Sequence, residues 1–269
     1  MAERNNKWTL ITGSTSGIGL ELAKLFADNG YNLVIVARAQ DELDKTAEEI
    51  SRLYGVDVQS ISKDLFEANG PFEVYDEVKA KGIQVDVLVN DAGQGLYGLF
   101  VETDIQRELQ IVQLNIASYL VLTKQFLKEM VARKDGKILQ VASIAGKMPG
   151  PYQSVYHATK AFILSHTMAL VNELKDTGVT ITALLPGATD TDFFHKADME
   201  DAKMIREDKD SLADPATVAK DGFDALMKGE SKVVSGLKNK LQTALSNIMP
   251  DSMVTAQLEK QMEPSDKSK

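Results

Sequence analysis

Short apolar runs alternate with longer amphipathic stretches along most of the chain. The short runs have the length and composition of strands, whereas the longer stretches repeat their apolar positions with helical spacing. Strands are predicted at residues 10–12, 33–37, 56–62, 85–90, 137–141, 179–185 and 232–235. Helices are predicted at residues 20–29, 41–53, 72–81, 105–131, 154–175 and 214–228. This alternation predicts an α/β fold with a parallel, doubly wound sheet.

The predicted strands are almost continuously apolar, as at residues 33–36 (Leu-Val-Ile-Val) and 85–89 (Val-Asp-Val-Leu-Val). Strands of this kind are typical of a sheet that helices cover on both faces. We therefore expect a mostly parallel seven-stranded sheet in one domain over residues 1–236.

The pattern loosens towards the C-terminus. Residues 186–214 are polar and irregular, which indicates a mobile flap over a site. Residues 237–262 are mildly amphipathic and are interrupted by Pro250, so we expect a helical extension over residues 237–269 with a frayed end from residue 263.

Composition excludes several classes of function. The 269-residue chain has a net charge of −9 and a pI near 5.0, which argues against a nucleic-acid partner. It has no Cys and only three scattered His, so neither disulfides nor a metal site are expected. No apolar leader precedes the first strand and no run has transmembrane length, so we expect a cytoplasmic protein without a membrane partner.

A glycine-rich loop lies between the first predicted strand and the first predicted helix, with the spacing Gly-x-x-x-Gly-x-Gly. Such a turn lets backbone N–H groups approach a diphosphate at a helix N-terminus, although a flexible turn would look the same. The Lys-Ser/Thr pair of a nucleoside-triphosphate loop is missing. The loop residues are Gly13, Ser14, Thr15, Ser16, Gly17, Ile18 and Gly19.

Arg38 follows the second predicted strand, about 20 residues after the glycines, where dinucleotide-binding folds recognise the adenosine ribose. An acidic residue there would bind a 2′-hydroxyl, whereas a guanidinium suits a 2′-phosphate. NADP(H) is therefore favoured over NAD(H), with an ordinary surface Arg as the alternative. No second basic residue is present inside the glycine loop.

Ser143, Tyr156 and Lys160 form a second group. Tyr156 and Lys160 are four residues apart on one predicted helix, so the phenol and the ammonium lie on the same face. An ammonium favours phenolate and would lower the tyrosine pKa, which suits Tyr156 to proton transfer. An ordinary pair on a helix surface is the alternative. Ser143 follows the preceding strand, from which its hydroxyl can meet that of Tyr156.

These motifs resemble those of the short-chain dehydrogenases/reductases, and the resemblance covers about residues 8–235. Further matches are the Asn-Asp-Ala-Gly sequence at residues 90–93, Asn115, and the Pro-Gly-x-x-x-Thr sequence at residues 186–191. The resemblance implies a Rossmann-like fold and hydride transfer between NADP(H) and a carbonyl or secondary alcohol carbon. The cofactor-binding residues that it implies are Gly13 to Gly19, Arg38, Asp64, Asn90, Ala92, Gly93, Tyr156, Lys160, Pro186, Gly187, Thr189 and Thr191.

The resemblance also implies individual roles. Tyr156 would exchange the proton, Ser143 would polarise the substrate oxygen, and Lys160 would bind the nicotinamide ribose and lower the tyrosine pKa. Asn115 would hold a water close to Lys160. Asp64 would lie by the adenine, and Thr189 and Thr191 by the carboxamide and the diphosphate.

One residue departs from the family pattern. Asp91 stands where the family has a second Asn, and a carboxylate cannot donate the hydrogen bonds of an amide. We expect a slight weakening of packing on the cofactor side and no effect on the proton-transfer group. The three His are expected to carry no chemistry: His157 is expected at a helix surface or interface, and His166 and His195 have no partner pattern.

Two apolar groups are either core residues or the lining of a lipophilic substrate pocket, and the pattern leaves both open. They are Leu96, Tyr97, Leu99 and Phe100, and Met148, Tyr152, Phe193 and Phe194. Helices 105–131 and 154–175 carry extra apolar positions, and the family resemblance implies that they pack against a symmetry mate to form a homodimer or homotetramer. The main alternative function is an NADP(H)-sensing protein that does no chemistry, and a further one is an enzyme that uses the hydride transiently.

Overall fold

The sheet has seven strands, all paired in parallel, in the order β3-β2-β1-β4-β5-β6-β7. The structure is a computed structural model that describes residues 5–207, 212–246 and 248–265. The order reverses after β3, which is the doubly wound arrangement that the sequence predicts, so the predicted fold class is confirmed. The strands are β1 Trp8–Thr12, β2 Asn32–Ala37, β3 Val58–Ser62, β4 Val85–Asn90, β5 Gly136–Val141, β6 Val179–Leu185 and β7 Lys232–Val234.

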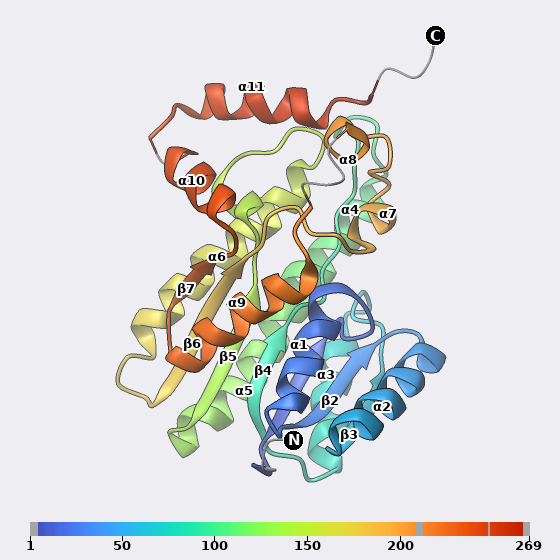
Figure 1. Ribbon diagram of the computed structural model, residues 1–269, viewed down its shortest axis with the longest axis vertical. Coiled ribbons are helices and arrows are strands. Elements are labelled where there is room, and N and C mark those ends of the chain that lie inside the picture. Colours follow the sequence, from blue (N-terminus) through green and yellow to red (C-terminus); the bar gives the residue numbers. More distant parts are fainter. Residues whose placement is uncertain (1–4, 208–211, 247, 266–269) are drawn as a thin grey trace.

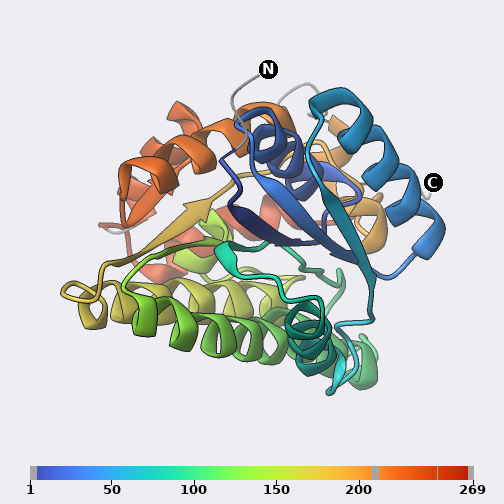
Figure 2. The same ribbon diagram turned by 90° about the horizontal axis from the view of Figure 1, so that it is seen from below.

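Helices cover both faces of the sheet (Figures 1 and 2). On one face α1 (Gly17–Asp28), α2 (Gln40–Tyr54) and α9 (Pro215–Lys228) bury Leu22, Phe26, Leu43 and Leu226 against the strands. On the other face α3 (Gly70–Ala80), α5 (Tyr119–Arg133) and α6 (Ser154–Glu173) bury residues that include Val74, Phe126 and Leu170. Two apolar cores therefore hold the sheet rigid from both sides, which fixes the positions of the loops at its edge.

The predicted helix over residues 105–131 is not one regular helix. It consists of α4 (Ile105–Val112), a π-helical turn η1 (Gln113–Ser118) and α5, which continues to Arg133. A π-helical turn adds a residue to the turn and is frequent at functional sites. Here the turn contains Asn115, whose side chain is bonded to residues outside the helix. Apolar periodicity alone does not reveal such an insertion.

The segment after β6 is more ordered than the flap that its polar sequence predicts. It contains two short helices, α7 (Phe193–Lys196) and α8 (Lys203–Glu207), which pack on a small apolar cluster that includes Met199 and Met262. Residues 208–211, which belong to the predicted flap, lie outside the described residues. The prediction of an irregular segment is therefore wrong for most of residues 193–207.

The C-terminal extension forms two helices, α10 (Leu237–Ser246) and α11 (Asp251–Met262), separated at Pro250 as predicted. Figure 1 shows α11 across the top of the molecule, beyond the sheet and beside α8. The predicted fraying is wrong for residues 263–265, because Lys203 N donates to Glu263 O at 3.0 Å and Ser265 N donates to Asp201 O at 2.9 Å. Residues 266–269 are outside the described residues. Within the described ranges, no helix has the length and apolar content that a membrane crossing needs.

Candidate active site

A cleft of about 1430 Å³ lies at the carboxyl ends of the strands. In open α/β sheets this edge is where ligands bind. We call the part of its lining that directly follows the strands the strand-end wall. Each strand contributes a residue to it: Gly13 after β1, Arg38 after β2, Lys63 after β3, Asp91 after β4, Ser143 after β5, Pro186 after β6 and Gly236 after β7.

The glycine loop forms a tight backbone cradle at the N-terminus of α1. Gly13 and Gly17 have φ angles of +72° and +56°, which residues other than glycine rarely adopt. A Cβ at Gly17 would lie 2.8 Å from Cγ2 of Thr191, and one at Gly19 would lie 2.3 Å from the Gly13 carbonyl oxygen. This close backbone, at the start of a twelve-residue helix, fits a dinucleotide diphosphate.

The predicted cofactor residues fall into two sets. Most line the cleft directly, namely Gly13, Thr15, Ser16, Gly17, Ile18, Arg38, Asp64, Ala92, Gly93, Pro186, Gly187, Thr189 and Thr191. Ser14, Gly19 and Asn90 lie behind this lining. The Ser14 hydroxyl donates to Val36 O at 3.4 Å, and the Asn90 amide donates to Thr123 and Gln140. These side chains therefore support the wall and do not form its surface.

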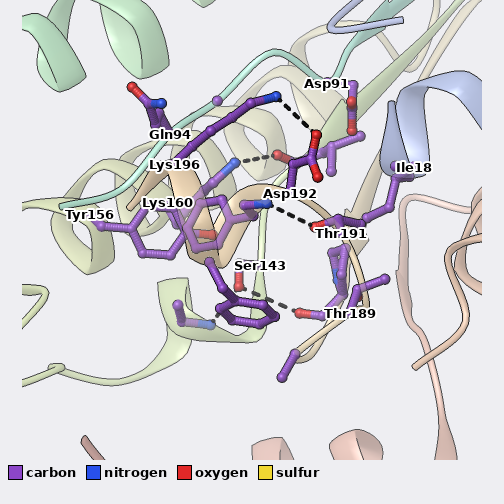
Figure 3. Close-up of a pocket in the computed structure, with 18 of the residues that line it drawn as sticks. Ile18, Asp91, Gln94, Ser143, Tyr156, Lys160, Thr189, Thr191, Asp192 and Lys196 are labelled. Atoms are coloured by element: carbon purple, nitrogen blue, oxygen red, sulfur yellow. Dashed lines mark hydrogen bonds and ion pairs between the residues drawn. The ribbon is translucent and has the colours of Figure 1, made fainter. Parts of the chain in front are cut away.

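Ser143, Tyr156 and Lys160 meet on one side of the cleft, as Figure 3 shows. Ser143 caps a short 3₁₀ turn, η2 (Ile144–Lys147), by accepting a hydrogen bond from Ala145 N at 3.0 Å. Lys160 is 4% exposed and donates to Val141 O at 2.9 Å, with its Nζ 5.7 Å from the centroid of the Tyr156 ring. The predicted group is thus brought together from β5 and α6.

The electrostatics of Tyr156 differ from the prediction. Burial raises the pKa of Tyr156 to about 12, and a hydrogen bond with Ser143 opposes this rise. Lys160 is not among the groups that shift this pKa, although it lies beside the ring. The lowered tyrosine pKa that the sequence predicts is therefore wrong for this structure, because burial of the phenolate is the largest cause of the shift and raises the pKa.

Asp91 is electrostatically linked to Lys160. Burial raises the pKa of Asp91, while the Lys160 ammonium and the Gly19 N–H lower it. Burial lowers the pKa of Lys160, and the Asp91 carboxylate opposes that change. The carboxylate also raises the pKa of Tyr156. The prediction that Asp91 leaves the proton-transfer group untouched is therefore wrong.

Asn115 is 1% exposed and lies behind the wall. Its amide nitrogen donates to Gln94 O and to Thr159 Oγ1, each at 2.9 Å, and its carbonyl accepts from Gln94 N at 3.0 Å. Asn115 thus fixes the main chain that follows β4 against α6. The relay water that the family resemblance implies stays a prediction.

Each of the three histidines has a hydrogen-bond partner within the fold. His157 is not at a surface: it is 6% exposed, its Nδ1 lies 2.8 Å from Met148 O, and Gly150 packs against its ring, so that prediction is wrong. Burial lowers its pKa. His166 pairs with the Tyr119 hydroxyl at 2.9 Å, and the exposed His195 pairs with Glu200. Both have partners that the sequence does not reveal.

The opposite side of the cleft, which we call the roof, carries apolar side chains together with Lys196, Lys203 and Lys260. It consists of α7, α8, α11 and the segment between α7 and α8. The roof residues that line the cleft include Phe193, Phe194, Met199, Met204, Leu258 and Met262, and Met148 faces them from the strand-end side. Tyr97 and Tyr152 pack behind the roof, whereas Leu99 and Phe100 are exposed to solvent and are not among the residues that line this cleft.

Several cleft residues are not singled out by the sequence. Lys63, Met199, Leu258 and Met262 have no motif around them. The spacing of Val254, Leu258 and Met262, four residues apart, is the one available signal, because it marks the buried face of a helix. Nothing in that spacing identifies the surface on which the helix packs.

Comparisons with known proteins agree with this geometry. A family model described as short chain dehydrogenase matches residues 7–202. A short-chain dehydrogenase from Sphingobium yanoikuyae, solved in complex with NADPH, has a TM-score of 0.80 at 27% identity, over 90% of this chain and 95% of that chain. A bulky-bulky ketone specific alcohol dehydrogenase from Comamonas testosteroni has a TM-score of 0.76 at 27% identity, over 91% and 94%.

Among relatives in sequence, the very-long-chain 3-oxoacyl-CoA reductase of Bos taurus is 33% identical over 186 residues. The match covers 67% of this chain and 58% of that protein. The chain therefore spans less than two thirds of the length of this relative.

Proposed function

The chain belongs to the short-chain dehydrogenase family, and from this premise we propose that it transfers a hydride between NADP(H) and a carbonyl or secondary alcohol carbon. The observation that carries the proposal is the convergence of Ser143, Tyr156 and Lys160 on a cleft that also contains the glycine cradle. A protein that only senses NADP(H) has no need of this buried proton-transfer group, so catalysis is the better explanation.

The residues present fit a nicotinamide dinucleotide. The cradle of Gly13 and Gly17 would hold the diphosphate, Arg38 a 2′-phosphate, and Thr189 and Thr191 the end nearest the catalytic group. When bound, the cofactor would supply the hydride, and the protein would supply orientation and electrostatics. A cleft of about 1430 Å³ leaves room for a substrate beside it.

The proton would move at the Tyr156 hydroxyl. Because burial raises its pKa to about 12, the phenol carries its proton at neutral pH and is ready to donate it. Ser143 would hold the same substrate oxygen through its hydroxyl, and its hydrogen bond to Tyr156 would stabilise the phenolate left after donation. Lys160 would bind the nicotinamide ribose.

We propose a bulky, lipophilic carbonyl substrate. The roof offers aromatic and methionine side chains, which adapt to large apolar groups. Two similar proteins bear names of the same kind: the Comamonas enzyme is described as specific for bulky-bulky ketones and the bovine one as a very-long-chain 3-oxoacyl-CoA reductase. Turnover confined to small polar ketones in a substrate screen would contradict this.

Self-association as a homodimer or homotetramer is also proposed. Val101, Ile105 and Leu109 are 89%, 55% and 53% exposed and follow one another along the loop before α4 and on α4 itself. Such a contiguous apolar surface suits a symmetric contact between copies. A single sedimenting species with the mass of one chain at micromolar concentration would rule the assembly out. The cytoplasmic location stays a prediction.

The test of the main proposal is a fluorescence titration with NADPH and with NADH, followed by a ketone screen. We expect NADPH to bind more tightly, Arg38→Asp to abolish that preference, and Tyr156→Phe to keep NADPH binding while losing turnover by about 10²–10⁴-fold. If the wild-type protein binds neither dinucleotide, or if Tyr156→Phe turns over normally, the proposed function is wrong.

A further inference from the structure

Two cationic residues directly follow neighbouring strands at the same edge of the sheet. Arg38 follows β2, and Lys63 follows β3, whose Ser62 pairs with Ala37 of β2. Lys63 N donates to Ala37 O at 3.0 Å, and Ser62 Oγ donates to Arg38 O at 2.7 Å. Both Arg38 and Lys63 line the cleft. The backbone therefore holds the two residues side by side, although they are 25 positions apart in sequence.

The Arg38 guanidinium is oriented by an aromatic ring. Its central carbon lies 5.0 Å from the centroid of Phe66, which also lines the cleft. Arg107 approaches the same ring at 5.7 Å but donates to Gln94 Oε1 at 2.9 Å, so it is already engaged. Within residues 5–207, 212–246 and 248–265, no carboxylate forms an ion pair with Arg38. Its charge is thus available to an anion.

Lys63 has a weak partner. Its Nζ lies 3.1 Å from Oε2 of Glu73, in the first turn of α3, and the two side chains are 30% and 54% exposed. An ion pair as exposed as this contributes little to stability. The ammonium can therefore leave Glu73 for a more strongly charged anion at small cost, and Glu73 keeps it in place until then.

The carboxylates near Arg38 are the reason why a phosphate at this end of the cleft needs a second cation. Glu42 and Asp64 line it as well, so without Lys63 the two carboxylates outnumber Arg38. Lys63 brings the charges that line this end of the cleft to two positive and two negative, with Glu73 as a further carboxylate outside the lining, 3.1 Å from the Lys63 Nζ. A phosphate monoester carries nearly two negative charges at neutral pH, so it would be repelled by the first arrangement and accommodated by the second.

We propose that Lys63 is a specificity-determining residue which, together with Arg38, binds the 2′-phosphate of NADP(H). The inference rests on the proposed function, because it assumes that a dinucleotide occupies the cleft. Arg38 presents a planar, bidentate donor and Lys63 a mobile point charge, so the pair grips the phosphate from two strands. NADH has a 2′-hydroxyl in place of the phosphate, so Lys63 stays paired with Glu73 and adds nothing to the affinity for NADH.

The experiment measures the dissociation constants of NADPH and NADH for four variants by nicotinamide fluorescence. Lys63→Gln is expected to weaken NADPH by about tenfold and to leave NADH within about twofold, since it removes one charge-assisted contact. Glu73→Gln is expected to tighten NADPH slightly, because the ammonium is released. Arg38→Gln is the positive control. Lys79→Gln is the matched control, because Lys79 forms a similarly exposed pair with Glu129 at 3.0 Å, away from the cleft.

A second probe isolates the phosphate site. Adenosine 2′-monophosphate and adenosine 5′-monophosphate compete with NADPH, and only competition by the 2′-isomer is expected to weaken in Lys63→Gln. Circular dichroism checks that each variant is folded. The inference is overturned if wild-type protein prefers NADPH and Arg38→Gln loses the preference while Lys63→Gln keeps it, or if Lys63→Gln weakens both dinucleotides equally. Absence of binding by wild-type protein overturns the proposed function itself.

Discussion

The two sides of the cleft are built by different forces. Backbone hydrogen bonds between neighbouring strands hold the strand-end wall, as in Gly13 N to Val36 O and Ala142 N to Leu184 O, both at 2.9 Å. Apolar side chains hold the roof, where Met199, Ile205 and Met262 form the centre of a small cluster. Backbone geometry is common to any sequence that forms the sheet, whereas side-chain packing changes with each substitution.

This difference separates two properties of the proposed enzyme. The strand-end wall, together with Tyr156 and Lys160 on the adjoining α6, would hold the cofactor and the proton-transfer group, which every substrate would use. The roof is rich in methionine, whose flexible side chain adapts to different shapes, so it would decide which carbonyl compounds reach Tyr156. Substitutions in the wall should therefore affect all substrates, and substitutions in the roof should affect some.

The largest effect is expected from Lys160→Met, which keeps the length of the side chain and removes its charge. Lys160 donates to Val141 O at the end of β5 and is the cation that opposes the buried Asp91 carboxylate, so its loss would displace the nicotinamide ribose and leave that carboxylate without a countercharge. Turnover should fall by about 10²–10⁴-fold for large and small ketones alike. Steady-state kinetics on both classes measures this, with the exposed Lys175→Met as a control. A loss confined to bulky ketones would contradict the division between wall and roof.

Gly19→Ala should cause the next largest effect, on the strand-end wall alone. The added Cβ would lie 2.3 Å from the Gly13 carbonyl and 2.6 Å from Oδ2 of Asp91, so the loop has to move. We expect a loss of about 3 kcal/mol in the free energy of unfolding, together with weaker NADPH binding. Urea unfolding and fluorescence titration measure the two. Gly82→Ala is the control, because nothing lies within 4 Å of its Cβ and only its positive φ is strained.

The same difference explains how far the sequence predicts the structure. The glycine loop, Arg38 and the Ser143, Tyr156 and Lys160 group are predictable because strand and helix periodicity places them at one sheet edge. The parallel pairing of the strands follows from the same periodicity, because a helix separates successive strands. Local spacing thus determines the wall almost completely.

The roof and the charges are less predictable. The position of α11 depends on long-range packing of Leu258 against Met148, about which a linear sequence says nothing. The pKa of Tyr156 depends on burial, and the effect of Asp91 on Lys160 depends on a distance across the fold. Lys63 comes next to Arg38 only through the pairing of β2 with β3. All these features are set by tertiary structure.

Leu258→Ala tests the roof. Leu258 is 7% exposed and packs with Met148 and Val254, so its truncation should loosen α11 and cost about 2 kcal/mol locally. We expect KM to rise for bulky ketones, with little change for small ones and none in the dissociation constant of NADPH. Leu241→Ala on α10, where the side chain is 64% exposed, is the matched control. Weaker NADPH binding in Leu258→Ala would show that roof and wall are coupled.

Asp91→Asn should have the smallest effect, and it probes charge within the wall. The carboxylate raises the pKa of Lys160 against the effect of burial, so the amide leaves burial unopposed and the pKa of Lys160 falls. Activity that needs the ammonium should then decline from a lower pH than in the wild type, by less than about tenfold at any pH. The pH profile of turnover measures this, with the exposed Asp28→Asn as a control.

Asp91→Asn should also change how the free energy of unfolding depends on pH. Burial raises the pKa of Asp91 above its unfolded value, so folded protein binds more protons than unfolded protein between those two pKa values, and stability falls as pH rises through that window. Asp91→Asn should lack this decline, because an amide does not titrate. Urea unfolding at pH 5 and pH 8 distinguishes the two forms: a variant that loses as much stability as the wild type between these pH values would show that Asp91 is not the buried charge that governs this part of the wall.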